Sequence, residues 1–236
     1  MTAEPGMEVH HTHRDVTGGW LRPAVFGVTD GLVSNFALIA GVVGGGVAPR
    51  TVALTGLAGL IAGAFSMATG EYVSVKSQAE LTQAEIAVEK AELRRSPAAE
   101  QAELAAMYRA RGLDAPLAAE VARQLSANPD QAWRVHAREE LGINPDDLPS
   151  PWTAAGSSFA AFSVGAFVPL LPYLLGATTL FWAMVCAGLA LFAAGAMVVR
   201  LTSRSLLYGG ARQLLLGSLS AAVTFGIGAL IGTGVG

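Results

Sequence analysis

One carboxylate lies inside an apolar stretch of this chain. Asp30 is the only charged residue after Arg22 in the stretch that ends at Gly46. The stretch is long enough to cross the hydrocarbon core of a bilayer, which takes about 20 mostly apolar residues. An ionised carboxylate there costs about 2.5 to 3.5 kcal/mol on insertion scales, so it is retained mainly where it faces a partner, a cavity or a transported ion. Asp30 therefore predicts an ion pathway.

Two residues of the next apolar stretch are candidates to complete this pathway. Met67 and Glu71 are four positions apart, so they share one face of a helix and can face Asp30. Two carboxylates beside a thioether can hold a partly dehydrated transition-metal ion. Protons and metal then compete for the same oxygens, which is the physical basis of proton-coupled exchange. The alternative for Met67 is ordinary packing, and Ser34 and Asn35 are polar neighbours without a specific signal.

Acidic residues also recur at helical spacing in the middle of the chain. Three predicted helices each place carboxylates or an imidazole on one face, at Glu85, Glu89 and Glu92, at Glu100 and Glu103, and at His136 and Glu140. Carboxylate and imidazole suit Fe²⁺, Mn²⁺ and Zn²⁺, whereas the lack of thiolates disfavours Cu(I). Carboxylates that project from facing helices form the di-metal sites of helical bundles. The alternative is a solvated acidic face on each helix.

Two electrostatic details favour a bound cation over that alternative. Glu139 and Glu140 lie in the last predicted turn of their helix, where the helix dipole disfavours anions. The like charges of Glu85 and Glu89 repel each other at a spacing of four residues. A cation bound among these side chains would reverse both penalties.

The composition indicates that the chain occupies two kinds of solvent. Of its 236 residues, 52% are hydrophobic and only 14% are charged, whereas a soluble domain carries about 25% charged residues. Apart from Asp30 and Glu71, every acid lies in the first 15 residues or between Glu80 and Asp147. A membrane protein with one acidic, water-exposed insert is therefore expected.

Several classes of function have no support in the sequence. The single cysteine, Cys186, provides neither a disulfide framework nor a thiolate cluster. The chain contains no phosphate-binding glycine loop and no nucleophile–base signature, so neither ATP-driven pumping nor hydrolysis is indicated. The polar, acidic N-terminus predicts no cleaved signal peptide.

Five stretches are apolar and long enough to span a bilayer. They are Leu21–Gly46, Thr51–Val75, Ala154–Leu175, Thr178–Val199 and Ala211–Val235. An odd number of spans puts the two termini on opposite sides of the membrane. Pro169 and Pro172 are expected to bend or break the third span near its end.

The distribution of Lys and Arg predicts the orientation, because cytoplasmic loops are enriched in both. With a cytoplasmic N-terminus, only Arg50 of the fifteen basic residues faces outward, and Arg14, Arg22 and Arg204 are among those inside. The reverse orientation would put fourteen outside. We therefore expect the N-terminus in the cytoplasm and the C-terminus outside.

The segment between the second and third spans reads as a small helical domain. Its first helix continues the second span, because Lys76 to Leu93 contains no Gly or Pro. Ser96-Pro97, Asp114 and Asn128-Pro129 each start a further helix, and Gly142 ends the last one near Leu141. The predicted domains are a cytoplasmic tail at 1–20 containing His10, His11 and His13, two spans at 21–76, a cytoplasmic helical metal-binding domain at 77–151 and three spans at 152–236.

Five sequence segments carry a resemblance to a known family. They are Asp30-Gly-Leu-Val-Ser, Ala64-Phe-Ser-Met-Ala-Thr-Gly-Glu-Tyr, Ala84-Glu-Ile-Ala with the Glu-Lys-Ala-Glu-Leu that follows, Glu139-Glu-Leu-Gly, and Pro-Leu-Leu-Pro-Tyr at 169–173. With these segments, the chain resembles the vacuolar iron transporter family, including its bacterial members. The resemblance extends from Leu21 almost to the C-terminus.

The resemblance implies a five-helix homodimer that exports Fe²⁺, and often Mn²⁺, from the cytosol in exchange for protons. The ion path of the family lies at the dimer interface, between the first two spans of each subunit. Its membrane acid corresponds to Asp30 and its pathway methionine to Met67, and Glu71 matches an acid common in bacterial members. The resemblance assigns the cytoplasmic metal ligands to Glu89, Glu92, Glu100, Glu103 and Glu140. One departure is that plant members have methionines where this chain has His136 and Ala137.

The sequence thus predicts an all-α membrane protein with five transmembrane helices and a cytoplasmic helical metal-binding insert. Its expected function is proton-coupled export of Fe²⁺ or Mn²⁺, with Zn²⁺ and Co²⁺ as further candidate ions and no resident cofactor. Its expected partners are metal ions, protons, the lipid bilayer and a second copy of the chain, with no nucleic acid. A bacterial plasma membrane is the expected location.

Two other functions are compatible with parts of the sequence. The first is a membrane-anchored metal sensor or buffer, in which the insert binds ions and the spans only anchor it. The second is an intramembrane ferroxidase, which is disfavoured because the chain lacks a paired Glu-x-x-His signature. A secondary transporter, and not an enzyme, is therefore the favoured interpretation.

Overall fold

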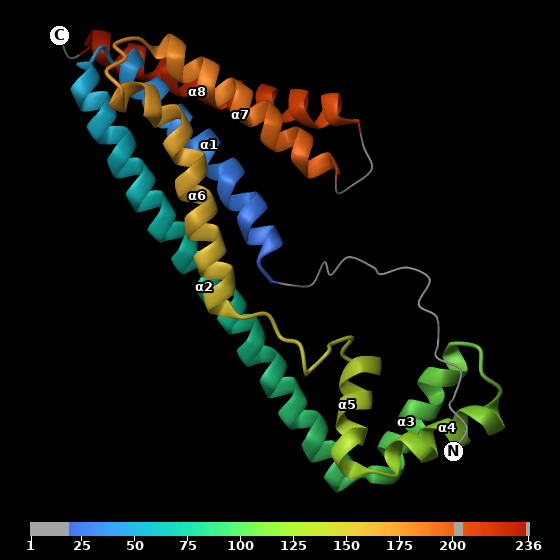
Figure 1. Cartoon of the computed structure of the whole chain (residues 1–236). Helices are drawn as coiled ribbons and strands as arrows, with labels where there is room; N and C mark the ends of the chain where they lie inside the picture. The colour runs from blue at the N-terminus through green and yellow to red at the C-terminus, as the bar shows by residue number, and fades with distance from the viewer. Residues whose placement is uncertain (1–18, 201–204, 235–236) are drawn as a thin grey trace, which may run out of the picture. The chain divides into compact units, whose positions relative to one another are not determined.

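The computed structural model describes residues 19–200 and 205–234, and every regular element in those ranges is a helix (Figure 1). The helices are α1 (Leu21–Gly44), α2 (Pro49–Arg95), α3 (Pro97–Ala110), α4 (Ala115–Ser126), α5 (Pro129–Glu139), α6 (Pro151–Leu174), α7 (Leu180–Arg200) and α8 (Leu206–Gly234). The predicted all-α class is confirmed. The histidines of the N-terminal tail (His10, His11 and His13) lie outside the described residues, as do Arg14 and Arg204.

Five of these helices are long and apolar enough to cross a membrane, as the sequence predicts. They are α1, α2, α6, α7 and α8, with mean hydropathies between 1.6 and 2.1 over their most apolar windows. The last helix begins at Leu206, five residues before the predicted start of the fifth span. The chain is therefore a multi-pass membrane protein by the length and composition of its helices.

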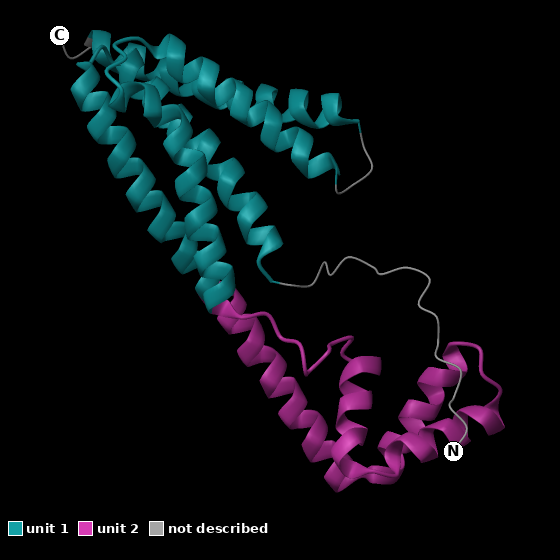
Figure 2. Ribbon diagram, viewed as in Figure 1, with its two compact units in different colours: residues 1–72, 152–236 teal, residues 73–151 magenta. Residues whose placement is uncertain are grey.

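The chain divides into two compact units, which are coloured separately in Figure 2. Unit 1 contains the described residues of Met1–Tyr72 and Trp152–Gly236, and unit 2 is Val73–Pro151. The helix α2 belongs to both units, because it continues without interruption from Pro49 to Arg95. The predicted continuation of the second span into the insert is thus confirmed.

Helix α1 is central to the packing of unit 1. Its residues Leu32 and Phe36 lie in a buried cluster with Leu191 of α7 and Ala221 of α8. One turn further on, Ile39 packs in a second cluster with residues of α2, α6 and α7. The apolar faces of four neighbouring helices therefore fix the position of α1.

Backbones of α1 and α6 meet closely through two glycines. A Cβ at Gly31 would overlap the carbonyl oxygen of Phe162, and a Cβ at Gly165 would overlap that of Val28. Small residues permit such close helix contacts in membranes. The contact holds the polar segment of α1 against α6.

Pro169 and Pro172 do not break α6, which continues to Leu174. Each proline removes one backbone hydrogen bond from a helix. Both rings are buried, and the intervening Leu170 belongs to the core cluster around Ile39. Because both prolines lie in the last two turns, packing of this segment can offset the lost hydrogen bonds.

Short helices with clear start signals build unit 2. The side chain of Asp114 accepts a hydrogen bond of 2.8 Å from the backbone N–H of Leu117, and that of Asn128 accepts one of 3.0 Å from Asp130. These contacts confirm the two predicted N-caps. Ser96 precedes α3 but makes no side-chain cap hydrogen bond. Gly142 has a φ of +65°, in agreement with its predicted role as a stop signal, although α5 already ends at Glu139.

Candidate functional site

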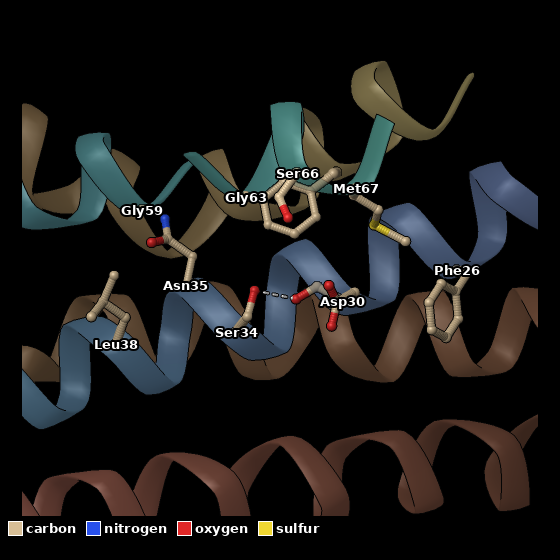
Figure 3. A pocket seen from close by; sticks show the side chains of 10 residues that line it. Phe26, Asp30, Ser34, Asn35, Leu38, Gly59, Gly63, Ser66 and Met67 are labelled. Carbon is tan, nitrogen blue, oxygen red and sulfur yellow. Dashed lines mark hydrogen bonds between the residues drawn. The ribbon is translucent and has the colours of Figure 1, made fainter. Parts of the chain in front are cut away.

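A pocket of about 320 Å³ lies between α1 and α2 in unit 1, and we call it the Asp30 pocket (Figure 3). It is lined by Phe26, Asp30, Ser34, Asn35 and Leu38 of α1, Gly59, Gly63, Ser66 and Met67 of α2, and Phe162 of α6. The helical period of α1 accounts for its contribution, because Phe26, Asp30, Ser34 and Leu38 are each four positions apart and Asn35 directly follows Ser34, so they line one side of the helix.

The structure brings Asp30 and Met67 into this one pocket, from two helices. Asp30 is exposed on the surface of the single chain, and no basic side chain within the described ranges forms an ion pair with it. The hydroxyl of Ser34 donates to the backbone oxygen of Asp30 at 2.6 Å, so it does not bond the carboxylate. A carboxylate, a thioether and hydroxyl groups thus face a common space and can ligate a divalent ion.

Glu71 is not among the residues that line the Asp30 pocket. It lies half-buried on α2, one helical turn beyond Met67. Its neighbour Tyr72 packs against Trp152, with the ring centroids 4.7 Å apart. The pocket therefore contains two of the three predicted pathway residues.

A second cluster of potential ligands lies in unit 2, and we call it the Glu89 cluster. Glu89 of α2, Glu100 of α3 and His136 of α5 are all buried, and each offers one ligand atom within 4.8 Å of the others. The Nδ1 atom of His136 lies 3.0 Å from an oxygen of Glu89 and 3.8 Å from one of Glu100. Two carboxylates and an imidazole at this separation can hold one Fe²⁺, Mn²⁺ or Zn²⁺ ion.

Three polar atoms of the Glu89 cluster have no hydrogen-bond partner among the described residues. Both ring nitrogens of His136 and the Oε1 atom of Glu89 are buried, and none makes a hydrogen bond with acceptable geometry to another described residue. A buried polar group without a partner costs about 1–3 kcal/mol. A bound cation would satisfy the carboxylate oxygen and one imidazole nitrogen.

Burial also sets the protonation of this cluster. It raises the pKa of Glu89 to about 7, with smaller contributions from the negative charges of Glu140 and Glu100. Burial likewise raises the pKa of Glu100, and it lowers that of His136. Near neutral pH the cluster therefore holds a neutral imidazole, which is the form that ligates metals, beside a carboxyl group that exchanges its proton readily.

The other predicted ligands surround this cluster. Glu92, Glu103 and Glu140 are not part of the group of three, but their negative charges raise the pKa of its carboxyl groups. Glu92 also lies 3.9 Å from Arg95, and Glu103 and Glu140 are exposed. The structure therefore separates three buried candidate ligands from three peripheral acids.

An arginine of the protein, Arg111, supplies the positive charge beside Glu139. Its carboxylate pairs with Arg111 of the segment after α3 and accepts a hydrogen bond of 3.1 Å from the hydroxyl of Tyr108. The dipole penalty predicted for Glu139 is thus offset by an arginine, without a metal ion. This pair was not predicted from the sequence, because Arg111 and Glu139 are 28 positions apart.

Comparisons with known proteins identify what the chain resembles. The model of the VIT family matches residues 21–229. A protein named vacuolar iron transporter from Acanthamoeba castellanii is 39% identical over 223 residues, which cover 91% of this chain and 79% of that protein. Vacuolar iron transporter 1 of Oryza sativa subsp. japonica is 33% identical over 230 residues, covering 95% of this chain and 90% of the relative. Vacuolar iron transporter 1 of Arabidopsis thaliana is 37% identical over 171 residues, which cover 70% of this chain and 67% of that protein.

Proposed function

The chain belongs to the VIT family, and on that premise we propose that it is a secondary transporter that exports Fe²⁺ or Mn²⁺ from the cytosol in exchange for protons. The observation that carries the proposal is the Asp30 pocket, where Asp30 and Met67 line one space between two apolar helices. An unpaired carboxylate at this position is costly in a membrane unless it serves an ion. The names of the relatives give iron as their transported ion.

Asp30, Met67 and the hydroxyls of Ser34 and Ser66 are the proposed ligands during passage. The carboxylate attracts the cation, and the thioether favours a transition metal over Mg²⁺ or Ca²⁺. A proton that binds Asp30 removes its charge and releases the metal, so opposite fluxes of the two ions are coupled at one group. Glu71 is proposed as a further exchange group on α2, one turn away from Met67.

The Glu89 cluster is proposed to collect ions before transport. Glu89, Glu100 and His136 would ligate the ion directly. The negative charges of the surrounding Glu92, Glu103 and Glu140 would raise the local concentration of divalent cations. Zn²⁺ and Co²⁺ fit the same donors, so the cluster itself is not expected to be strongly selective.

A homodimer is part of this proposal. Asp30 is exposed on the single chain, and only 17% of the most apolar window of α2 is buried. Lipid can cover exposed apolar side chains such as Leu54 and Phe65, but it solvates a carboxylate poorly. A second copy that packs across this face would enclose Asp30 in protein.

The proposed location is a bacterial plasma membrane, with the N-terminus in the cytoplasm and the C-terminus outside. The bias of Lys and Arg supports the orientation. The presence of Glu71, which the resemblance associates with bacterial members, supports the membrane type. In such a cell, transport outward across the plasma membrane would replace transport into a vacuole.

Flux measurements in proteoliposomes test the proposed function. Purified protein is reconstituted with a pH gradient, and entry of Fe²⁺, Mn²⁺, Co²⁺ and Zn²⁺ is followed in one preparation. We expect Fe²⁺ and Mn²⁺ flux that depends on the gradient, with movement of protons in the opposite direction. Correctly inserted protein that moves neither ion would contradict the proposal.

The second candidate function is a membrane-anchored metal sensor or buffer. It is favoured by one observation, namely that all three residues of the Glu89 cluster lie within unit 2. This function predicts metal binding by the full chain without any flux. The same proteoliposomes, assayed for both binding and flux, separate the two functions.

A further inference from the structure

Asn35 is a buried polar residue whose amide nitrogen makes a hydrogen bond, whereas its amide oxygen accepts none from the described residues. Its side chain is 2% exposed, and its Nδ2 group donates a hydrogen bond of 2.6 Å to the backbone oxygen of Ala166 in α6. Because a carbonyl oxygen can only accept, this bond fixes which end of the amide is the nitrogen. The Oδ1 atom is then directed elsewhere, and it accepts no hydrogen bond from the described residues.

The free oxygen belongs to the Asp30 pocket. Asn35 lines that pocket, and its side chain extends toward α2 near Gly59 (Figure 3). A Cβ at Gly59 would lie only 3.0 Å from Oδ1, which shows that this atom faces the surface of α2. The oxygen is therefore buried against the backbone of Gly59, where most buried acceptors would have a donor.

We propose that the Oδ1 atom of Asn35 is a second ligand position for the transported cation, deeper in the pocket than Asp30. The two residues are five positions apart on α1, which corresponds to about 7.5 Å along the helix axis. This inference rests on the proposed transport function. It adds a ligand of a different kind, because a neutral amide oxygen binds a cation without exchanging a proton.

The chemistry of this ligand makes Asn35 a specificity-determining residue. A carbonyl oxygen is a hard donor that suits Mn²⁺ better than Zn²⁺, whereas the thioether of Met67 has the opposite preference. The two groups together therefore favour an ion of intermediate character over purely soft and purely hard competitors. A neutral donor also binds weakly enough for the ion to leave, which conduction requires.

Two variants test the oxygen in different ways. Asn35→Leu has a similar shape but removes both the Oδ1 atom and the bond to Ala166. Gly59→Ala keeps Asn35 and its bond to Ala166, and it places a methyl group 3.0 Å from Oδ1 once the Leu38 side chain shifts. Gly226→Ala on α8 is the matched control, because a Cβ there meets no atom within 4 Å.

The measurement is Mn²⁺ uptake into proteoliposomes, with Zn²⁺ as a competing inhibitor. For Asn35→Leu and Gly59→Ala, we expect the KM for Mn²⁺ to rise about tenfold, the effect of losing about 1.4 kcal/mol of binding. The inhibition constant of Zn²⁺ should change by less than about threefold, since Zn²⁺ depends less on a hard oxygen. Gly226→Ala should behave as the wild-type chain.

The outcomes separate this inference from the function on which it rests. Equal losses for Mn²⁺ and Zn²⁺ would assign Asn35 a structural role only, and unchanged constants in Gly59→Ala would also overturn the inference. If Asn35→Leu does not fold, Gly59→Ala decides the question. Absence of flux in the wild-type chain would overturn both proposals together, whereas wild-type flux with unaffected variants would overturn only the one about Asn35.

Discussion

The two candidate sites differ in how they compensate charge. The Asp30 pocket in unit 1 contains a single carboxylate among neutral oxygens and a thioether, and it is open on the surface of the single chain. The Glu89 cluster in unit 2 contains two buried carboxylates and an imidazole, with three more acids nearby. One site therefore has little charge to hold an ion, and the other has an excess.

This difference indicates two different tasks for the same type of cargo. Strong binding requires several anionic ligands and a low local dielectric, as in the Glu89 cluster. Passage requires that binding be strong enough for entry and weak enough for release, which a single titratable carboxylate provides. A change in one site should therefore leave the other site unaffected.

The largest effect is expected from Asp30→Ala. Flux of Fe²⁺ and Mn²⁺ should fall to the level of empty liposomes, because Asp30 is the only acid among the described residues that line the pocket. Metal binding by the full-length variant should remain close to that of the wild-type chain, since the Glu89 cluster is unchanged. Titration of the same protein with Mn²⁺ before and after reconstitution measures both quantities. Transport at the wild-type rate would refute the role of Asp30.

Glu89→Gln should have the converse effect. Loss of one of the buried carboxylates should weaken metal binding in unit 2 by at least about 10- to 100-fold, the cost known for loss of a residue that only supports a ligand. At saturating ion concentration, the maximal flux should stay within about twofold, since the Asp30 pocket is intact and uniform loss of binding changes KM first. Calorimetric titration and flux assays together check this prediction.

Glu85→Gln is the matched control, because Glu85 is exposed on the same helix and lies outside the cluster. It should bind metal as the wild-type chain does. If Glu85→Gln and Glu89→Gln weaken binding equally, then general negative charge, and not direct ligation, explains the affinity.

Metal binding by the Glu89 cluster should depend on pH in one direction. Burial raises the pKa of Glu89 to about 7, so protons compete with the metal at any pH below that value. Affinity should therefore fall about tenfold from pH 6.5 to pH 5.5 if binding displaces one proton. Burial lowers the pKa of His136, so protonation of its imidazole competes with the metal less than that of a free histidine would. The Glu89→Gln variant should show a flatter profile, and an equally steep one would exclude Glu89 as the competing group.

The sequence was sufficient to predict the helices and several of their starts. Five spans follow from apolar length alone, and the helices of unit 2 follow from residues such as Asp114 and Asn128, whose caps are local interactions. The presence of Asp30 and Met67 in one pocket agrees with their helical faces and with the family resemblance. Local chemistry and composition determine these features, so they are visible in a single sequence.

Contacts between distant segments could not be predicted in the same way. Helical spacing shows that Glu85, Glu89 and Glu92 share a face, but it does not show that only Glu89 meets Glu100 and His136. That choice depends on the angles at which α2, α3 and α5 pack. The bond between Asn35 and Ala166 joins residues 131 positions apart, and it is this bond that leaves the Oδ1 atom on the side of α2, near Gly59.

The smallest effect is expected from Arg111→Gln. Arg111 pairs with Glu139, which lies next to Glu140 in sequence but does not belong to the Glu89 cluster. The Arg111 side chain is 51% exposed, and a pair of this kind contributes about 0–1 kcal/mol. Metal affinity should therefore change by less than about threefold, with no change in flux. A loss as large as that of Glu89→Gln would mean that Glu139 and its arginine position the metal site. The peripheral acids would then contribute to metal binding as much as the buried ligands do.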